Sequence, residues 1–250
     1  MTEILTEIAG GVMTLTFNRP DKKNALTAEM YAALADAFAT AEADPAVRVI
    51  LLAGAGGVFT AGNDLQDFLA RPPSGDDAPV FRFLRALVTA QKPLVAAVSG
   101  VAVGVGTTML LHCDLVYAGD SARLSMPFVN LALVPEAGSS LLLPRLVGHQ
   151  KAAELLMFGE PIDARTAREI GLVAEVFPDA ALAGEVRARV AKLAAKAPEA
   201  LRLTKQLMKA PKATAAEQMA AEGALFQQRL GSAEAREAFT AFMEKRAPRF

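Results

Sequence analysis

Segments with the pattern of buried strands alternate with segments with the pattern of helices along most of this chain. Residues 12–17 put Met13, Leu15 and Phe17 on one face, which is the two-residue period of a strand. Strands that alternate with helices are typical of parallel β/α units, so we predict an α/β fold. The predicted strands are 12–17, 47–53, 94–98 and 114–117, and the predicted helices are 27–38, 80–88 and a short one near Thr107.

The pattern changes towards the C-terminus to alanine-rich helices with no strand after them. These helices carry Leu225, Phe226 and Phe239 on apolar faces that must be buried, either on the protein's own core or on a neighbouring subunit. We expect the second, and predict a core of residues 1–190 followed by a helical oligomerisation region of residues 191–250. The predicted helices of this part are 181–197, 199–208, 215–230 and 233–245.

The composition excludes several classes of function. A hydrophobic fraction of 52% with a formal net charge of -1 gives a packed chain without the basic surface that nucleic acid or an anionic membrane requires. Cys113 has no second cysteine to pair with, and His112 and His149 are too few for a zinc site, so no metal is expected and both histidines are predicted to be structural. The first residues are acidic where a signal peptide would be basic, and the apolar run 93–105 is too short to span a bilayer. We therefore expect a cytoplasmic protein with neither nucleic-acid nor membrane partners.

Two glycine-bearing turns follow predicted strands, and each can offer backbone N–H groups to a ligand. Gly62 allows an unusual backbone angle and Asp64 can cap the next helix, which would leave the N–H of Ala61 pointing into a cleft. The second turn, 100–106, leads into a helix whose first N–H groups, near Val105, can receive a negative oxygen. Each turn alone is also compatible with an ordinary strand-to-helix connection. Together they predict a pair of donors for an oxyanion.

Glu136 is the candidate partner base, because it is a lone carboxylate in an apolar run just before a helical pattern. Burial would raise the pKa of this carboxyl, whereas a helix N-terminus would lower it, and both directions are open at this point. The alternative interpretation is a glutamate that only complements the start of the helix.

Together these segments resemble the enoyl-CoA hydratase/isomerase (crotonase) superfamily over most of the chain, from residue 12 to about residue 177. The resemblance implies an α/β crotonase-like spiral of ββα units with a C-terminal α-helical trimerisation region, and hence a homotrimer or a hexamer built as a dimer of trimers. It also implies that Ala61 and Val105 donate the two N–H groups that hold a thioester oxygen. The matching segments are Asn24-Ala25-Leu26, Phe59 to Leu65, Lys92-Pro93, Gly100 to Gly106, Cys113-Asp114 and Gly171-Leu172-Val173.

An acyl-CoA thioester is the substrate that the resemblance implies, so coenzyme A would be part of the substrate and no separate cofactor is expected. Lysines in this site would suit the negatively charged phosphates of coenzyme A. Without the resemblance, the same lysines would be interpreted as solvated surface charge. The side chains expected to shape the acyl pocket are Phe68, Phe81, Phe83, Leu84 and Phe128. The residues that the resemblance assigns to the substrate site are Lys22, Lys23, Asn24, Ala25, Leu26, Gly62, Asn63, Asp64, Leu65 and Phe128.

Two departures from the family pattern narrow the reaction. Hydratases of this family use two glutamates, and the matching positions here are Thr108 and Phe128, which cannot exchange protons with substrate near neutral pH. Glu136 instead falls where Δ3,Δ2-enoyl-CoA isomerases that resemble the peroxisomal type carry their single carboxylate. The resemblance therefore implies an enoyl-CoA isomerase of fatty acid metabolism, in which Glu136 moves a proton from C2 to C4 while Phe128 excludes water.

Two other functions stay open on the sequence. An enoyl-CoA hydratase or a related crotonase reaction would need another carboxylate, such as Glu160 or Asp67, to complete the site. A non-catalytic acyl-CoA-binding protein would keep both glycine turns and lose nothing when Glu136 is replaced.

Overall fold

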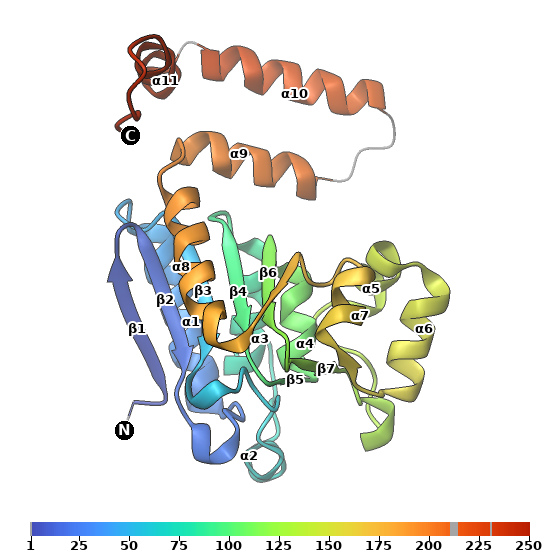
Figure 1. The fold of residues 1–250 in the computed structure, drawn as a ribbon. Helices are drawn as coiled ribbons and strands as arrows, with labels where there is room; N and C mark the ends of the chain where they lie inside the picture. The colour runs from blue at the N-terminus through green and yellow to red at the C-terminus, as the bar shows by residue number, and fades with distance from the viewer. Residues whose placement is uncertain (1, 211–214, 231) are drawn as a thin grey trace.

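A six-stranded sheet forms the centre of the fold in the computed structural model, which describes residues 2–210, 215–230 and 232–250. Strand β1 pairs antiparallel with β2, and every other pair in this sheet is parallel, which confirms the predicted α/β class. In spatial order the strands are β1 (Ile4–Ala9), β2 (Val12–Phe17), β3 (Val49–Gly54), β4 (Leu94–Val98), β6 (Leu115–Gly119) and β9 (Glu175–Phe177) (Figure 1). The prediction missed β1, because all its side chains after Ile4 are exposed and give no alternation of burial.

The two faces of this sheet are covered by different helices, as the two-residue period of its strands requires. Ile50 and Leu52 on β3 belong to the larger core with α1 (Ala28–Ala43) and α3 (Pro79–Thr89). Val49 and Leu51, on the opposite face of the same strand, pack with α8 (Asp179–Ala194). The sheet is therefore buried on both sides, and Figure 1 shows α8 lying in front of it.

The beginning of α1 follows the capping that its sequence predicts. The Thr27 hydroxyl accepts a hydrogen bond from the N–H of Met30 at 3.3 Å, and Glu29 lies in the first turn. A threonine side chain satisfies one of the N–H groups that a helix start leaves without an intrahelical partner. The predicted helix is confirmed and extends to Ala43.

A smaller sheet joins the second glycine turn to the rest of the protein. Its strands, in spatial order, are β5 (Val101–Val103), β7 (Arg123–Ser125) and β8 (Ile162–Asp163). A single parallel bridge between Thr60 and Ala102 connects β5 with the first glycine turn, so the two turns lie side by side. The remaining helices up to β9 are η1 (Pro20–Lys22), η2 (Ala55–Gly57), α2 (Leu65–Ala70), α4 (Val105–Thr108), η3 (Met109–His112), η4 (Val129–Leu131), α5 (Ser139–Val147), α6 (His149–Phe158) and α7 (Ala164–Glu169).

The C-terminal helices lie beyond one end of the main sheet (Figure 1). They are α9 (Pro198–Lys209), α10 (Ala215–Leu230) and α11 (Ala233–Met243), and no strand follows β9 in the part of the chain that the structure describes. Helix α8 packs on the sheet as far as Ala194, and the division into regions 1–190 and 191–250 stays a prediction. Within the described ranges, no helix is both long enough and apolar enough to cross a bilayer.

Candidate active site

The two glycine turns line one small cavity. Its volume is about 190 Å³, and apolar side chains from the segment after β7 close its other side. The first turn contributes Ala61, Gly62, Asn63 and Leu65, and the second contributes Val103, Gly104 and Val105. The remaining lining residues are Phe68, Pro127, Phe128, Leu131 and Leu133. The predicted juxtaposition of the turns is therefore present, and Phe128 lies at the cavity as expected.

The N–H groups that the turns leave available differ from the predicted pair at one position. The N–H of Ala61 donates to the carbonyl of Lys23 at 2.9 Å, so the prediction that it is left free is wrong. Among the hydrogen bonds of the described residues, the N–H groups of Asn63 and Val105 have no acceptor. The available pair is thus Asn63 and Val105, both at the same cavity.

A bridge to the segment before α1 explains why Asn63 replaces Ala61. Leu26 forms a parallel bridge with Asn63, donating to the carbonyl of Gly62 at 2.8 Å and accepting from the N–H of Asp64 at 2.9 Å. In such a bridge the neighbours of the central residue bond to the partner strand, and the central residue's own N–H points to the other side. The N–H of Asn63 is therefore directed away from Leu26.

Gly62 is required by the close approach of the two turns. Its φ is +87°, and a Cβ added there would stand 2.6 Å from the carbonyl oxygen of Val103. Any other residue would combine a strained backbone with a clash against main-chain atoms. Next to it, the buried Tyr31 hydroxyl donates to the side-chain oxygen of Asn63, so α1 also holds the turn in place.

Glu136 lies beside the second turn. The Thr108 hydroxyl donates to its carboxylate, and the same hydroxyl is 3.4 Å from the carbonyl oxygen of Val105. Burial raises the pKa of Glu136, while the hydrogen bond from Thr108 works in the opposite direction with a smaller effect. The sequence left open whether the pKa of Glu136 is raised or lowered, and the structure gives a raised pKa. The Glu136 carboxylate is therefore more basic than an exposed one.

A second cavity adjoins the Glu136 segment and has the size for a ligand's chain. It measures about 430 Å³ and is lined by residues of α3, by Asp76 in the segment before α3, and by Ala137 and Gly138. Phe81 and Leu84 line it as expected. Phe83 does not, because its side chain is fully buried against Tyr31 and Phe38 in the core.

The loop before α1 divides into exposed and buried residues. Lys22 and Lys23 are exposed, and Ala25 is half-buried. Asn24 is fully buried, and its side chain donates to the carbonyls of Ala55, Val58 and Phe59 and accepts from the N–H of Arg19. The polar atoms of this side chain are therefore used to hold the loop to residues 55–59 and to Arg19, and the place of Asn24 in the substrate site stays a prediction.

Leu26 and Asp64 are likewise engaged within the protein. The side chain of Leu26 is fully buried and its backbone forms the bridge to Asn63, and its place in the substrate site stays a prediction. Asp64 caps α2 by accepting from the N–H groups of Gln66 and Asp67, as its position predicts. The Arg19 guanidinium, 2.6 Å from Asp64, holds the pKa of that carboxyl below its usual range. Leu65 remains half-exposed at the cavity mouth.

The carboxylates considered for a hydratase site lie elsewhere. Asp67 accepts from the N–H of Ala28 at 2.7 Å and pairs with Arg71, which commits it to the start of α1. Glu160 is exposed in the segment before β8. Neither lines the two cavities described above. Glu136 is the carboxylate that the Thr108 hydroxyl holds beside the second turn.

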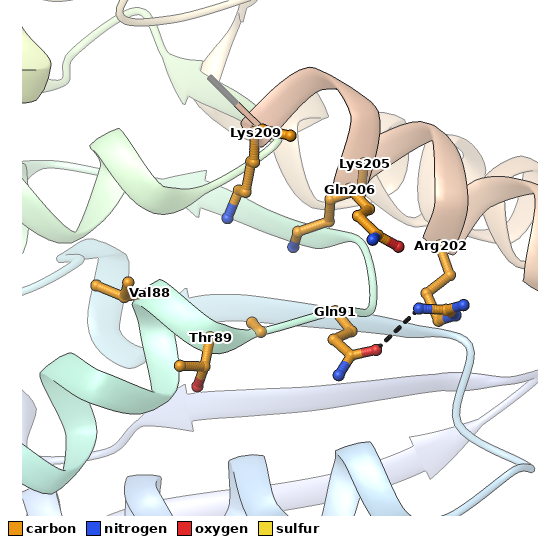
Figure 2. A pocket seen from close by; sticks show the side chains of 9 residues that line it. Val88, Thr89, Gln91, Arg202, Lys205, Gln206 and Lys209 are labelled. Atoms are coloured by element: carbon orange, nitrogen blue, oxygen red, sulfur yellow. Dashed lines mark hydrogen bonds between the residues drawn. The ribbon is translucent and has the colours of Figure 1, made fainter. Parts of the chain in front are cut away.

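A third cavity, of about 420 Å³, lies between the end of α3 and helix α9 and is basic (Figure 2). Most of its charge is already compensated, because Arg202 pairs with Glu199 and Lys205 pairs with Asp114 at 2.7 Å. Figure 2 shows Arg202 also donating to Gln91, at 3.1 Å. Lys205 is not among the residues predicted from the sequence, although a lysine among the apolar positions of an amphipathic helix is a signal for a buried ion pair.

No group of three or more potential metal ligands occurs among the described residues. His112 is buried with its Nε2 2.7 Å from the carbonyl oxygen of Ala137, so it has a structural partner in keeping with its predicted role. Burial raises the pKa of the Cys113 thiol to about 12, which leaves it protonated and unreactive at neutral pH.

The sheet order and the paired turns define an α/β protein of the crotonase type. A solved structure from Magnetospirillum magneticum AMB-1 is 49% identical in sequence and superposes with a TM-score of 0.96. The match covers 100% of this chain and 99% of the Magnetospirillum chain. Residues 7–250 match the family described as Enoyl-CoA hydratase/isomerase. The chain belongs to the enoyl-CoA hydratase/isomerase family.

Two relatives illustrate the range of the family. Enoyl-CoA delta isomerase 2 of Rattus norvegicus is 40% identical over 82% of this chain, which spans 54% of the rat protein. The 1,2-epoxyphenylacetyl-CoA isomerase of Escherichia coli is 37% identical over 100% of this chain and 98% of its own length. The chain thus spans about half the rat protein but nearly all of the bacterial one.

Proposed function

We propose that this protein is a Δ3,Δ2-enoyl-CoA isomerase of fatty acid metabolism. The observation that carries the proposal is one carboxylate, Glu136, made more basic by burial and held by Thr108 beside the second turn, whose Val105 N–H shares a cavity with that of Asn63. A pair of N–H groups stabilises the oxyanion of an enolate, and a single base suffices to move a proton along a chain. The names of the rat and bacterial relatives support an isomerase.

The proposed reaction uses Glu136 twice. Its carboxylate removes a proton from C2 of a 3-enoyl-CoA, and the electron pair spreads over the thioester oxygen and C4. The N–H groups of Asn63 and Val105 hold the oxygen of this dienolate. The protonated Glu136 then returns the proton to C4, which gives the 2-enoyl-CoA with no atom gained or lost. Phe128, 7% exposed, keeps water away from the intermediate.

The substrate brings coenzyme A with it, so the proposed reaction needs no further cofactor. The exposed Lys22 and Lys23 lie on the segment that pairs with the Asn63 turn, where their charge favours the phosphates of coenzyme A. The acyl chain extends into the cavity lined by Phe81 and Leu84, which adjoins the backbone of the Glu136 segment.

The reaction is tested by offering 3-enoyl-CoA and 2-enoyl-CoA separately to the protein and following double-bond migration and water addition. We expect fast migration and slow hydration, because one carboxylate cannot both activate water and protonate the α-carbon in the usual two-carboxylate route. Fast hydration would contradict the isomerase and support the hydratase alternative. Binding of both thioesters without either reaction would support a non-catalytic acyl-CoA-binding protein.

The pH profile of the reaction follows from the environment of Glu136. The Glu136 base acts when it is ionised, and burial raises its pKa. We therefore expect kcat/KM to reach its plateau above that pKa and to decrease as the pH falls through it. Thr108→Val removes the hydrogen bond that lowers the pKa, so the acid limb should move to still higher pH. Thr107→Val is the control, because the buried Thr107 hydroxyl donates to Ala102 instead. An unchanged limb in Thr108→Val would contradict this assignment.

Gly62→Ala should lower kcat/KM by about 10²–10³-fold, the usual effect of losing one oxyanion donor. The added Cβ would collide with the Val103 carbonyl and turn the neighbouring N–H of Asn63. Steady-state kinetics with 3-enoyl-CoA measure the loss. Gly10→Ala is the matched control, since Gly10 also has a positive φ but nothing within 4 Å of its Cβ position. Equal losses in both variants would show that backbone strain alone is responsible.

We also propose that the protein is a homotrimer or a dimer of trimers. Met208 and Met219 are each 70% exposed and Phe226 is 66% exposed, and a groove of about 610 Å³ opens between α9 and α10. Apolar side chains exposed together favour contact with another subunit. Light scattering should give three or six times the chain mass of 26.3 kDa, and a mass of one chain would contradict the proposal.

A further inference from the structure

One short helical segment carries the second oxyanion turn at its start and a buried histidine at its end. Helix α4 begins at Val105, and η3 continues it without interruption to His112. Thr108 lies between them and holds the carboxylate of Glu136. Thr108 and His112 are four residues apart, so they lie on the same face of the segment, the face towards Glu136 and Ala137.

The contact of His112 is with the carbonyl of Ala137, the residue that follows Glu136. Its Nε2 is 2.7 Å from the carbonyl oxygen of Ala137, and because a carbonyl can only accept, this nitrogen carries the hydrogen. His112 is 7% exposed, and burial lowers the pKa of its imidazole, so the ring is neutral with the hydrogen on Nε2. Ala137 has a φ of 53°, a conformation that a residue with a side chain adopts only when its surroundings impose it.

A second buried side chain, that of Ser139, holds the carbonyl of Glu136. The carbonyl of Glu136 accepts from the N–H of Ser139 at 3.0 Å and from its hydroxyl at 2.7 Å, and Ser139 is fully buried. The carbonyls of Glu136 and of Ala137 are thus both held by buried side chains. Ser139 is the first residue of α5, directly after the loop, whereas His112 connects the loop to the α4–η3 segment.

We propose that His112 is a positioning residue, which sets the distance between the Glu136 carboxylate and the N–H of Val105 by fastening the Glu136 loop to the α4–η3 segment. The inference rests on the proposed function, since it assigns His112 a role through the base. The group that binds the oxyanion and the group that fastens the base then belong to one rigid element. A misplacement of a catalytic group by about 1 Å can cost about 10²-fold in rate.

The far end of this segment is itself fixed, as a positioning element requires. Asp114 accepts from the N–H of Leu94 at 2.8 Å and pairs with the buried Lys205, whose ammonium also donates to the carbonyl of Lys92. Lys205 comes from α9, above the basic cavity of Figure 2. The segment is therefore attached to β4 and α9 directly after His112, and it cannot follow a displaced Glu136 loop.

The hydrogen position on His112 is tested in the intact protein by nitrogen NMR with labelled histidine. The chain has two histidines, so two imidazole rings are observed, and His149→Gln identifies the other one. We expect the His112 ring to be neutral with its hydrogen on Nε2 at pH 7. A ring without a hydrogen on Nε2 would overturn the proposal, and this measurement does not depend on any variant of His112 folding.

The positioning role is tested with His112→Leu, which removes the donor, and His112→Gln, whose amide can replace it. We expect His112→Leu to lower kcat about 10–100-fold with KM within about twofold, because the base is displaced while the thioester site is intact. Its acid limb should move to lower pH, since a detached Glu136 loses the burial that raises its pKa. His112→Gln should recover most of kcat and the wild-type limb, and His149→Leu, at an exposed position, should change neither.

The outcomes separate this inference from the function on which it rests. A folded His112→Leu protein with the wild-type kcat and acid limb would overturn the inference, and so would a loss that His112→Gln does not recover. If Glu136→Gln is inactive in the same series, the proposed base stands and only the role of His112 has failed. If Glu136→Gln is fully active, the proposed function itself has failed.

Discussion

Glu136→Gln should lower kcat for double-bond migration by about 10²–10⁴-fold, the range that a positioned general base contributes. The amide has nearly the shape of the carboxylate and can still accept from the Thr108 hydroxyl, so packing is preserved. It cannot take a proton from C2, and the one carboxylate among the lining residues of the two cavities, Asp76, is exposed in the segment before α3. The loss should therefore be in kcat, with the affinity for the thioester almost unchanged.

Rates of migration with 3-enoyl-CoA, together with the affinity for a saturated acyl-CoA, measure this effect. Glu160→Gln is the matched control, because it makes the same change at an exposed position and should leave both quantities within about twofold. Wild-type migration by Glu136→Gln would exclude Glu136 as the base. A large loss of thioester affinity would instead show that the carboxylate contributes to substrate binding.

Lys205→Met should destabilise the protein by about 3–5 kcal/mol, the usual cost of breaking a buried ion pair from one side. The side chain of Lys205 is 4% exposed and that of Asp114 is 16% exposed, so water cannot take the place of the lost ammonium. Methionine fills a similar volume and leaves Asp114 as an unpaired buried charge. Denaturant unfolding at equal protein concentration measures the change without mixing it with subunit association.

Two further variants show whether the unpaired charge is the cause. Lys151→Met breaks the pair with Glu154 on α6, whose side chains are 35% and 58% exposed, and should cost less than about 1 kcal/mol. Lys205→Met combined with Asp114→Asn removes both charges and should recover part of the loss, since the amide oxygen can still accept from Leu94. Equal effects of Lys205→Met and Lys151→Met would contradict burial as the reason.

The sequence by itself determined the class of fold and the choice of Glu136 as the candidate base. The two-residue period of β2 and the cap at Thr27 are local, and the structure confirms both. Glu136 was identified as the candidate base from its apolar surroundings and from the family resemblance, and the structure places it next to the second glycine turn. Periodicity and capping depend on residues within one or two turns of each other, so a single sequence contains them.

The tertiary structure decided which groups at the site are available. Asn63 offers its N–H in place of Ala61 because Leu26, from a distant segment, forms the bridge that orients this turn. Asn24 matches the family pattern, yet its side chain is buried and its hydrogen bonds are all to backbone groups of the protein itself. Whether a peptide N–H is free depends on the hydrogen-bond acceptor that lies next to it after folding. That acceptor can come from a distant segment, so no local pattern in the sequence predicts it.

The same reason applies to His112. From the sequence it was predicted to be structural, and only the folded chain shows that its partner is the peptide next to Glu136. Likewise, Lys205 became buried because α9 brings it to Asp114. Local sequence determined the strands, the capped helix and the glycine turns. Long-range contacts determined the direction of each N–H, the basicity of Glu136 and the partner of each buried charge. These three properties depend on groups that are far apart in the chain and meet only in the folded protein.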